Sequence, residues 1–140
     1  KNKTMATTTA QLVITSTDLL SDSLSLSAIA TLTNAGSATG MTQTTGLARK
    51  KTESTSLYIL YDQSALAVPA ASAHKIYIKN LSTTAAEYVT ITVNAEEVGR
   101  LYAGDWCFFP WSAHDASNDI SITPSVSSAL TIEHMLFFES

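Results

Sequence analysis

Charged residues are scarce in this sequence. Asp, Glu, Lys and Arg make up 14% of the 140 residues, against 45% hydrophobic residues, and the net charge is -4. A nucleic-acid-binding surface needs clustered Lys and Arg side chains to neutralise phosphates. The main basic cluster is the short run Arg49, Lys50 and Lys51. We therefore expect no nucleic-acid partner.

Cysteine and long apolar runs are also scarce. The single cysteine, Cys107, has no partner for an intrachain disulfide, and its aromatic neighbours predict a buried, unreactive thiol. No apolar run approaches the roughly 18 residues that a membrane-spanning helix needs. The N-terminus lacks the apolar core of a signal peptide. The sequence therefore predicts a soluble protein without a membrane partner.

Serine and threonine are the abundant polar residues. Threonine favours pleated strands, with its hydroxyl on the solvent side, and both residues disfavour long surface helices. A chain of 140 residues can bury a core of its own without disulfides or metals. We predict an N-terminal tail over residues 1–10 and a single β domain over residues 11–140.

Alternating apolar and polar residues predict the strands. They are expected at residues 11–15, 23–33, 56–61, 75–81, 88–93, 98–102, 105–111, 119–123 and 129–138. We expect 11–15 at an edge and 56–61 in the centre of a sheet, because 56–61 is apolar on both faces. Residues 88–111 read as a β-meander, joined to 75–81 by a hairpin. The predicted fold is all-β, an antiparallel β-sandwich of about eight strands, with the jelly roll among its candidate topologies.

The predicted strand 105–111 has apolar side chains on both faces. Trp106 and Phe108 point one way, whereas Cys107, Phe109 and Trp111 point the other. One face must fill a core, and the other must meet a second layer or another molecule. The tight turn that precedes this strand predicts that Gly104 has a positive φ angle or occupies a position that tolerates no side chain.

The chain has more large apolar groups than one two-layer core should need. Met135 and Phe137 lie on the face of the last strand opposite its regular apolar series. Together with Phe109 and Trp111 they would leave an exposed apolar patch on a monomer. We therefore predict a homo-oligomer, with subunit contacts at Trp106 and at these four residues.

Residues 34–56 differ from the rest of the chain. This stretch is rich in Gly, Ser and Thr, and only Met41 and Leu47 are sizeable apolar groups. We expect a long loop or arm that becomes ordered across a neighbouring subunit, because so few anchors cannot offset the entropy of ordering it. Met41 and Leu47 would then be apolar anchors, and acidic groups of the partner would face Arg49, Lys50 and Lys51. The open alternative is that residues 47–56 form an edge strand of the same sandwich.

Residues suited to catalysis or metal binding do not cluster in the sequence. None of His74, His114 and His134 has a second ligand at a spacing typical of a local metal site, and we expect no metal or cofactor. His134 is predicted to be a hydrogen-bonded core histidine. Residues 112–115 include Ser, His and Asp, but four adjacent residues cannot place a nucleophile and its base correctly. We expect a non-enzymatic protein.

The second half of the chain, residues 74–138, resembles small virion proteins of tailed bacteriophages, especially those of marine and cyanobacterial phages. The similarity consists of Lys79-Asn80, then the turn sequence Gly99-Arg-Leu-Tyr-Ala-Gly-Asp105, then Phe108-Phe-Pro110. It implies a structural part of the virion, most simply a capsid decoration or cement protein. Such a protein would bind other virion proteins, chiefly the major capsid protein, and a homotrimer would match a local threefold axis.

A β-sandwich module of the tail or its fibres, binding a host receptor or glycan, is the alternative function. Tyr102, Trp106 and Trp111 could form an aromatic platform on which sugars stack. Exposed, coplanar indole rings would favour this alternative. Burial of the rings at a subunit contact would favour the structural role.

Overall fold

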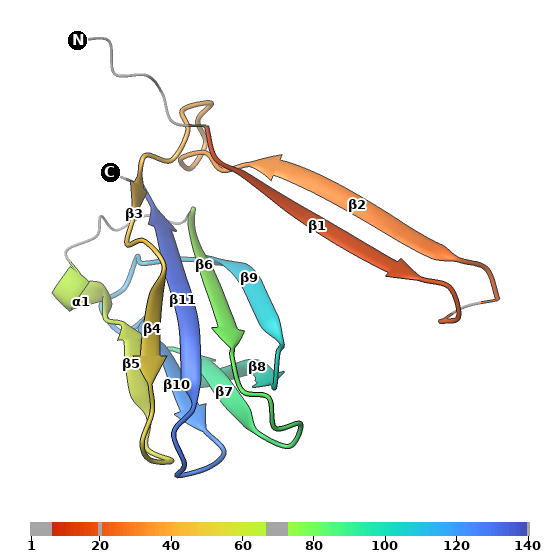
Figure 1. The fold of residues 1–140 in the computed structure, drawn as a ribbon. Coiled ribbons are helices and arrows are strands. Elements are labelled where there is room, and N and C mark those ends of the chain that lie inside the picture. The colour runs from red at the N-terminus through yellow and green to blue at the C-terminus, as the bar shows by residue number, and fades with distance from the viewer. Residues whose placement is uncertain (1–6, 20, 67–72, 140) are drawn as a thin grey trace.

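The computed structural model describes residues 7–19, 21–66 and 73–139. It shows a β-sandwich from which a two-stranded hairpin projects (Figure 1). The elements in chain order are β1 (Thr9–Ser16), β2 (Leu24–Thr31), β3 (Gln43–Thr44), β4 (Ala48–Lys51), β5 (Tyr58–Tyr61), α1 (Gln63–Leu66), β6 (His74–Asn80), β7 (Tyr88–Val93), β8 (Glu96–Tyr102), β9 (Trp106–Trp111), β10 (Ile120–Pro124) and β11 (Thr131–Phe138).

Two antiparallel sheets form the sandwich. One has the order β5-β10-β7-β8, and the other has β11, β6 and β9 side by side, with β3 and β4 both pairing with the free edge of β11. From β4 to β11 the chain passes repeatedly from one sheet to the other, so that β4-β11-β6-β9 faces β5-β10-β7-β8. This order is that of an eight-stranded jelly roll. The predicted all-β antiparallel sandwich is confirmed.

The predicted meander over residues 88–111 is wrong. β7 pairs with β8, but β9 pairs with β6 in the opposite sheet. The turn before β9 is tied to the end of β6, because the Gly104 amide donates to the Asn80 carbonyl and the Asn80 amide donates to the Asp105 carbonyl, both at 3.0 Å. The connection at residues 81–87 therefore joins the two sheets instead of forming a hairpin.

The strand β5 lies at a sheet edge, not in the centre as expected. Among the described strands it pairs only with β10, and the pairing is interrupted by a register shift. Tyr58 and Leu60 pack against the core and Tyr61 is buried, whereas Leu57 and Ile59 are about half exposed. One set of apolar side chains on β5 thus packs on the core, and the other set is partly exposed to solvent instead of being covered by a second layer.

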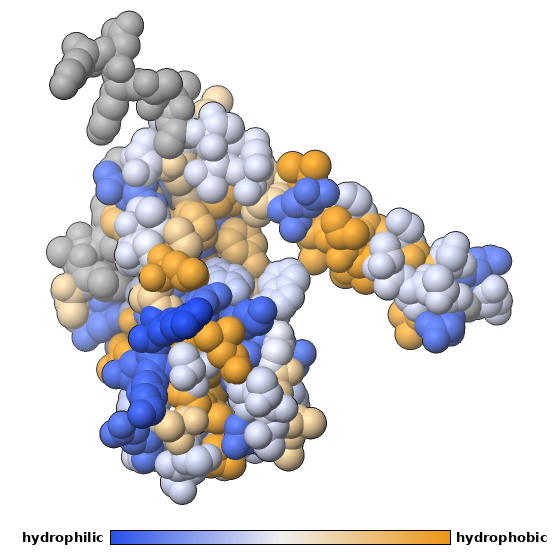
Figure 2. Space-filling model, in the orientation of Figure 1, coloured by the Kyte–Doolittle hydropathy of each residue, from blue (hydrophilic) through white to orange (hydrophobic). Residues whose placement is uncertain are grey.

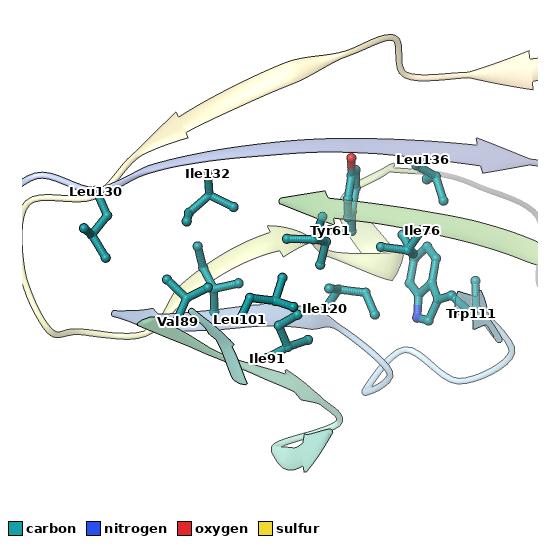
Figure 3. Close-up of a cluster of buried hydrophobic side chains, with 13 residues drawn as sticks. Tyr61, Ile76, Val89, Ile91, Leu101, Trp111, Ile120, Leu130, Ile132 and Leu136 are labelled. Atoms are coloured by element: carbon teal, nitrogen blue, oxygen red, sulfur yellow. The ribbon is translucent and has the colours of Figure 1, made fainter. Parts of the chain in front are cut away.

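The core lies between the two sheets (Figure 3). Ile76, Ile78, Ile132, Leu136 and Trp111 come from one sheet and have at most 1% of their surface exposed. The opposite sheet contributes a matching set of aliphatic side chains, namely Val89, Ile91, Leu101, Ile120 and Ile122. Burial of a large aliphatic side chain is worth about 1.5 to 3 kcal/mol, so this cluster is the main source of stability.

His134 is the hydrogen-bonded histidine that the sequence predicts. Its Nδ1 atom lies 2.7 Å from the hydroxyl oxygen of Tyr61, and the two rings meet edge to face with centroids 5.2 Å apart. Burial lowers the pKa of His134, and nearby Lys50 lowers it further. Burial also raises the pKa of Tyr61 to about 12. Both groups are therefore neutral at physiological pH.

The first two strands leave the sandwich altogether. Within the part of the chain that the structure describes, β1 and β2 pair only with each other, over eight residue pairs, and extend away from the two sheets (Figure 1). β1 begins at Thr9, inside the predicted tail of residues 1–10. The base of the hairpin is anchored, since Leu32 and Met41 are each 3% exposed. The Leu32 amide donates to the Thr8 carbonyl at 2.8 Å, and the Met41 amide donates to the Leu32 carbonyl at 3.0 Å.

Residues 34–56 contain two short strands that are joined to the sandwich. β3 and β4 pair with β11, and the Thr45 and Thr52 amides donate to the Leu136 and Leu130 carbonyls. The edge-strand alternative for residues 47–56 therefore corresponds to β4. Long-range backbone hydrogen bonds help to offset the entropy of ordering this segment, which its few apolar side chains alone cannot do. Local composition does not reveal such bonds.

Candidate functional site: an apolar sheet face beside a projecting hairpin

The solvent side of β11, β6 and β9 carries a cluster of large apolar side chains, here called the outer face. Tyr77 stands opposite Phe108 of β9 and Met135 of β11. Trp106 is 51% exposed, and the other members are partly exposed. Phe108 and Phe137 meet edge to face, with ring centroids 6.4 Å apart. The outer face consists of Tyr77, Trp106, Phe108, Met135 and Phe137.

Charged groups surround this apolar cluster. Lys75 and Lys79 lie on the same side of β6 as Tyr77, since side chains alternate along a strand. The Tyr77 hydroxyl donates to Glu133 at 3.2 Å, and Arg49 forms an ion pair with the same carboxylate at 3.4 Å. Burial raises the pKa of Tyr77, and the hydrogen bond to Glu133 raises it further. The outer face is therefore an apolar centre with a mainly basic rim.

The hairpin is amphipathic. Ile14 pairs with Leu26 and Leu12 pairs with Ala28, so these four side chains share one face. Leu12, Ile14 and Leu26 are 39%, 45% and 45% exposed. That face, here called the hairpin face, consists of Ala10, Leu12, Ile14, Leu24, Leu26, Ala28 and Ala30. An isolated two-stranded ribbon is marginally stable at best in water, so this one needs a covering surface.

A groove separates the hairpin from the outer face. It is lined on the hairpin side by Ala10, Gln11, Leu12, Ala28, Ile29 and Ala30, and on the sandwich side by Tyr77, Lys79, Trp106 and Phe108. Figure 2 shows the opening between the hairpin and the sandwich, with apolar side chains on the hairpin beside it. Two apolar surfaces of one chain thus face each other without closing on each other.

Three of the predicted interface residues belong to the outer face. These are Trp106, Met135 and Phe137. Phe109 packs against the core, and Trp111 is 1% exposed, with its indole nitrogen donating to the Asn118 carbonyl at 2.7 Å. Both therefore lie on the core side of β9, where Trp111 is buried and Phe109 is partly exposed.

Tyr77 and Phe108 were missed as candidates. The alternation along β9 places Phe108 on the same side as Trp106, and this signal was available in the sequence. Tyr77 alternates with Ile76 and Ile78 in the same way. Neither residue identifies itself as part of a cluster until the pairing of β9 with β6 is known.

Of the other predicted contact residues, Arg49 lies at the rim of the outer face, through its ion pair with Glu133. Met41 is buried in its own chain, whereas Leu47 is 61% exposed. Lys50 lies over the Tyr58 ring, 5.3 Å from its centroid, and Lys51 approaches Glu53 at 4.0 Å. The basic side chains of β4 therefore already have neighbours within the same chain.

The aromatic platform that a glycan site would require is not formed. Trp106 and Trp111 lie on opposite faces of β9, because their positions differ by an odd number. Tyr102 belongs to β8 in the other sheet and packs against Tyr88, with ring centroids 5.0 Å apart. Among the three aromatic candidates, only Trp106 remains available on the outer face.

The surroundings of Cys107 and Asp115, two residue types that enzymes use in catalysis, are those of structural residues. Burial raises the pKa of the Cys107 thiol to about 11, which keeps it protonated. Hydrogen bonds from the Ser117 amide and hydroxyl lower the pKa of Asp115 within a turn. The described residues include no group of three or more His, Cys, Asp or Glu side chains that could hold a metal ion. In the described ranges, no helix has the length and apolarity that crossing a membrane requires.

Comparison of the chain with protein-family models, curated proteins and solved structures finds no match.

Proposed function

We propose that this chain is a non-enzymatic structural protein of a tailed-phage virion, a capsid decoration protein that binds the assembled shell as a homo-oligomer. The observation that carries the proposal is the pair of unpartnered apolar surfaces, the outer face and the hairpin face. Apolar patches of this kind on a small protein mark contact sites with other macromolecules.

The motif on which the phage resemblance rests has a structural role in this fold. Asn80, Gly104 and Asp105 form the corner at which β6 ends and β9 begins, through reciprocal backbone hydrogen bonds. The side chain of Asp105 also accepts a hydrogen bond from the Tyr102 amide at 3.0 Å. A motif that shapes a corner supports a structural family more than a catalytic one.

A decoration protein needs only modest free energy from each copy. A protein that binds the assembled shell and not its dissociated subunits stabilises the shell by mass action. Contacts repeated at many equivalent sites gain further through avidity. A sandwich with one sheet edge extended by β3 and β4, one open apolar face and one projecting hairpin suits this role.

A tail or fibre module that binds a receptor or glycan is the second candidate. The exposure of Trp106 beside the groove favours it. The burial of Trp111 counts against a stacked sugar platform. The two candidates differ in abundance, because a shell protein occupies hundreds of sites and a tail protein occupies a few to a few dozen.

The test is a measurement of copy number on purified virions that encode this chain. Quantitative mass spectrometry against a labelled peptide standard gives its ratio to the major capsid protein. We expect hundreds of copies per particle, and a lower temperature of DNA release from particles stripped of the protein. A count of a few dozen or fewer would favour the tail candidate, and absence from the virion would refute both.

A further inference from the structure

We propose that the hairpin of one copy packs on the outer face of a second copy of the same chain. The hairpin face of the first copy covers Tyr77, Trp106 and Phe108 of the second. This inference deepens the proposed function, since it names the partner of the unpartnered surfaces, and it rests on that proposal only for its biological setting.

The two surfaces match in chemistry and in size. The hairpin face is aliphatic throughout its paired length apart from Ser16, and the outer face is mainly aromatic. At about 3.4 Å per residue, the eight residues of β1 extend about 27 Å and the seven of β6 extend about 24 Å. A two-stranded ribbon can therefore cover the length of the outer face as a third β layer.

The charges of the two surfaces are opposite in sign. Residues 7–31 contain two charged side chains, Asp18 and Asp22, both near the hairpin tip. The charge of the projecting hairpin is therefore negative. The rim of the outer face carries Lys75 and Lys79 on the strand that runs through its middle. Opposite charges at a rim guide association and disfavour wrong orientations.

The occupant is a second copy because the hairpin is held away from its own sandwich. Buried Leu32 and Met41 fix its base, together with the bridge between Thr33 and Gly40. The groove between the hairpin and the outer face of the same chain stays open in this arrangement. Each chain has one hairpin and one outer face, so a closed oligomer that exchanges hairpins leaves neither surface uncovered.

The first test compares two double variants by light scattering after gel filtration at low micromolar concentration. Ile14→Thr with Leu26→Thr replaces a facing pair on the hairpin face, and Thr keeps the strand preference. The matched control, Val13→Thr with Val98→Thr, replaces two exposed aliphatic side chains that lie off both surfaces. We expect the parent and the control to be oligomers. We expect the hairpin variant to shift to the monomer mass of 14.9 kDa with an unchanged far-ultraviolet β-spectrum.

The second test separates exchange between copies from closure of the hairpin on its own chain. The face variant, Trp106→Thr with Phe108→Thr, removes the receiving surface and should also be monomeric. A mixture of the hairpin variant and the face variant still contains one intact hairpin and one intact face. We expect mixed oligomers, detected by pull-down with a tag on one variant only.

A monomeric parent, a hairpin variant that stays oligomeric, or a mixture that fails to associate would each overturn the inference. The proposed function is judged separately, by the presence and copy number of the chain on virions. A monomer that still decorates particles would overturn the exchange alone. An exchanging oligomer that is absent from particles would overturn the proposed function alone.

Discussion

The side-chain nitrogen of Asn80 donates a hydrogen bond to the backbone carbonyl of Leu101 at 3.1 Å, and so connects β6 of one sheet to β8 of the other. The same nitrogen lies 3.2 Å from the Glu87 carbonyl, and the side-chain oxygen accepts from the Ser82 amide. Asn80 is fully buried. Its amide therefore satisfies backbone groups of three segments at the corner where the chain passes between sheets.

Replacing Asn80 by Ala should destabilise the fold strongly. The change leaves two carbonyls and one amide without their partner, and a buried unsatisfied group costs about 1 to 3 kcal/mol. We expect a total loss of about 3 kcal/mol, measured by urea denaturation. Asn118→Ala is a useful comparison, because the Asn118 side chain makes one exposed hydrogen bond, to the Ser112 carbonyl, and should cost far less. Equal losses in the two variants would show that the buried network carries no special weight.

Replacing Ala95 by Gly should stabilise the protein. Asn94 and Ala95 join β7 to β8 with φ angles of 51° and 63°, the left-handed pair typical of a tight hairpin turn. A left-handed conformation costs a residue with a β-carbon about 1 kcal/mol, so Gly should gain about that amount. Ala103→Gly is the matched control in the next turn, since Ala103 has no positive φ. We expect a higher melting temperature for the first variant only, and a gain in both or neither would contradict the argument.

Replacing Gly104 by Val should destabilise the protein through backbone strain. The positive φ predicted for Gly104 is confirmed, at 81°. An added β-carbon would meet no atom within 4 Å, so the penalty comes from conformation and not from a clash. We expect a loss of about 2 kcal/mol, somewhat more than for Ala because Val is β-branched. Gly99→Ala, in equally open space but without a positive φ, is the control and should be tolerated.

His134 should make the stability depend on pH below neutrality. Its pKa is lowered in the fold, chiefly by burial, so below pH of about 6.5 the unfolded chain takes up a proton more readily than the native chain. The contribution of neutral His134 to the free energy of unfolding should therefore be fully present above that pH, and it should be lost as the pH drops toward the pKa of His134 in the folded chain. Urea denaturation between pH 7.5 and pH 5.5 measures this slope. The His134→Gln variant, which cannot titrate, should lose part of it, and an unchanged slope would exclude His134 as its source.

Local patterns determined most of the strands, β3 and β4 excepted, and the two sides of a strand such as β9. The alternation along Trp106–Trp111 placed Trp106 and Phe108 opposite Cys107, Phe109 and Trp111, and the structure has this division. The turn at Gly104 was equally predictable, because a short link between two apolar strands demands a residue that accepts positive φ. These features depend on neighbours in the chain, which a sequence displays directly.

Only the tertiary structure decided which strands pair and which apolar face is left open. β9 pairs with β6 instead of β8, so Trp111 enters the core while Trp106 joins Tyr77 and Met135 on the outer face. The strict alternation of β2 predicted a strand, but it could not show that the strand leaves the sandwich. Local periodicity is the same for a strand whose apolar face packs on a core and for a strand whose apolar face is exposed. The difference lies in contacts between residues distant in the chain, which no local pattern contains.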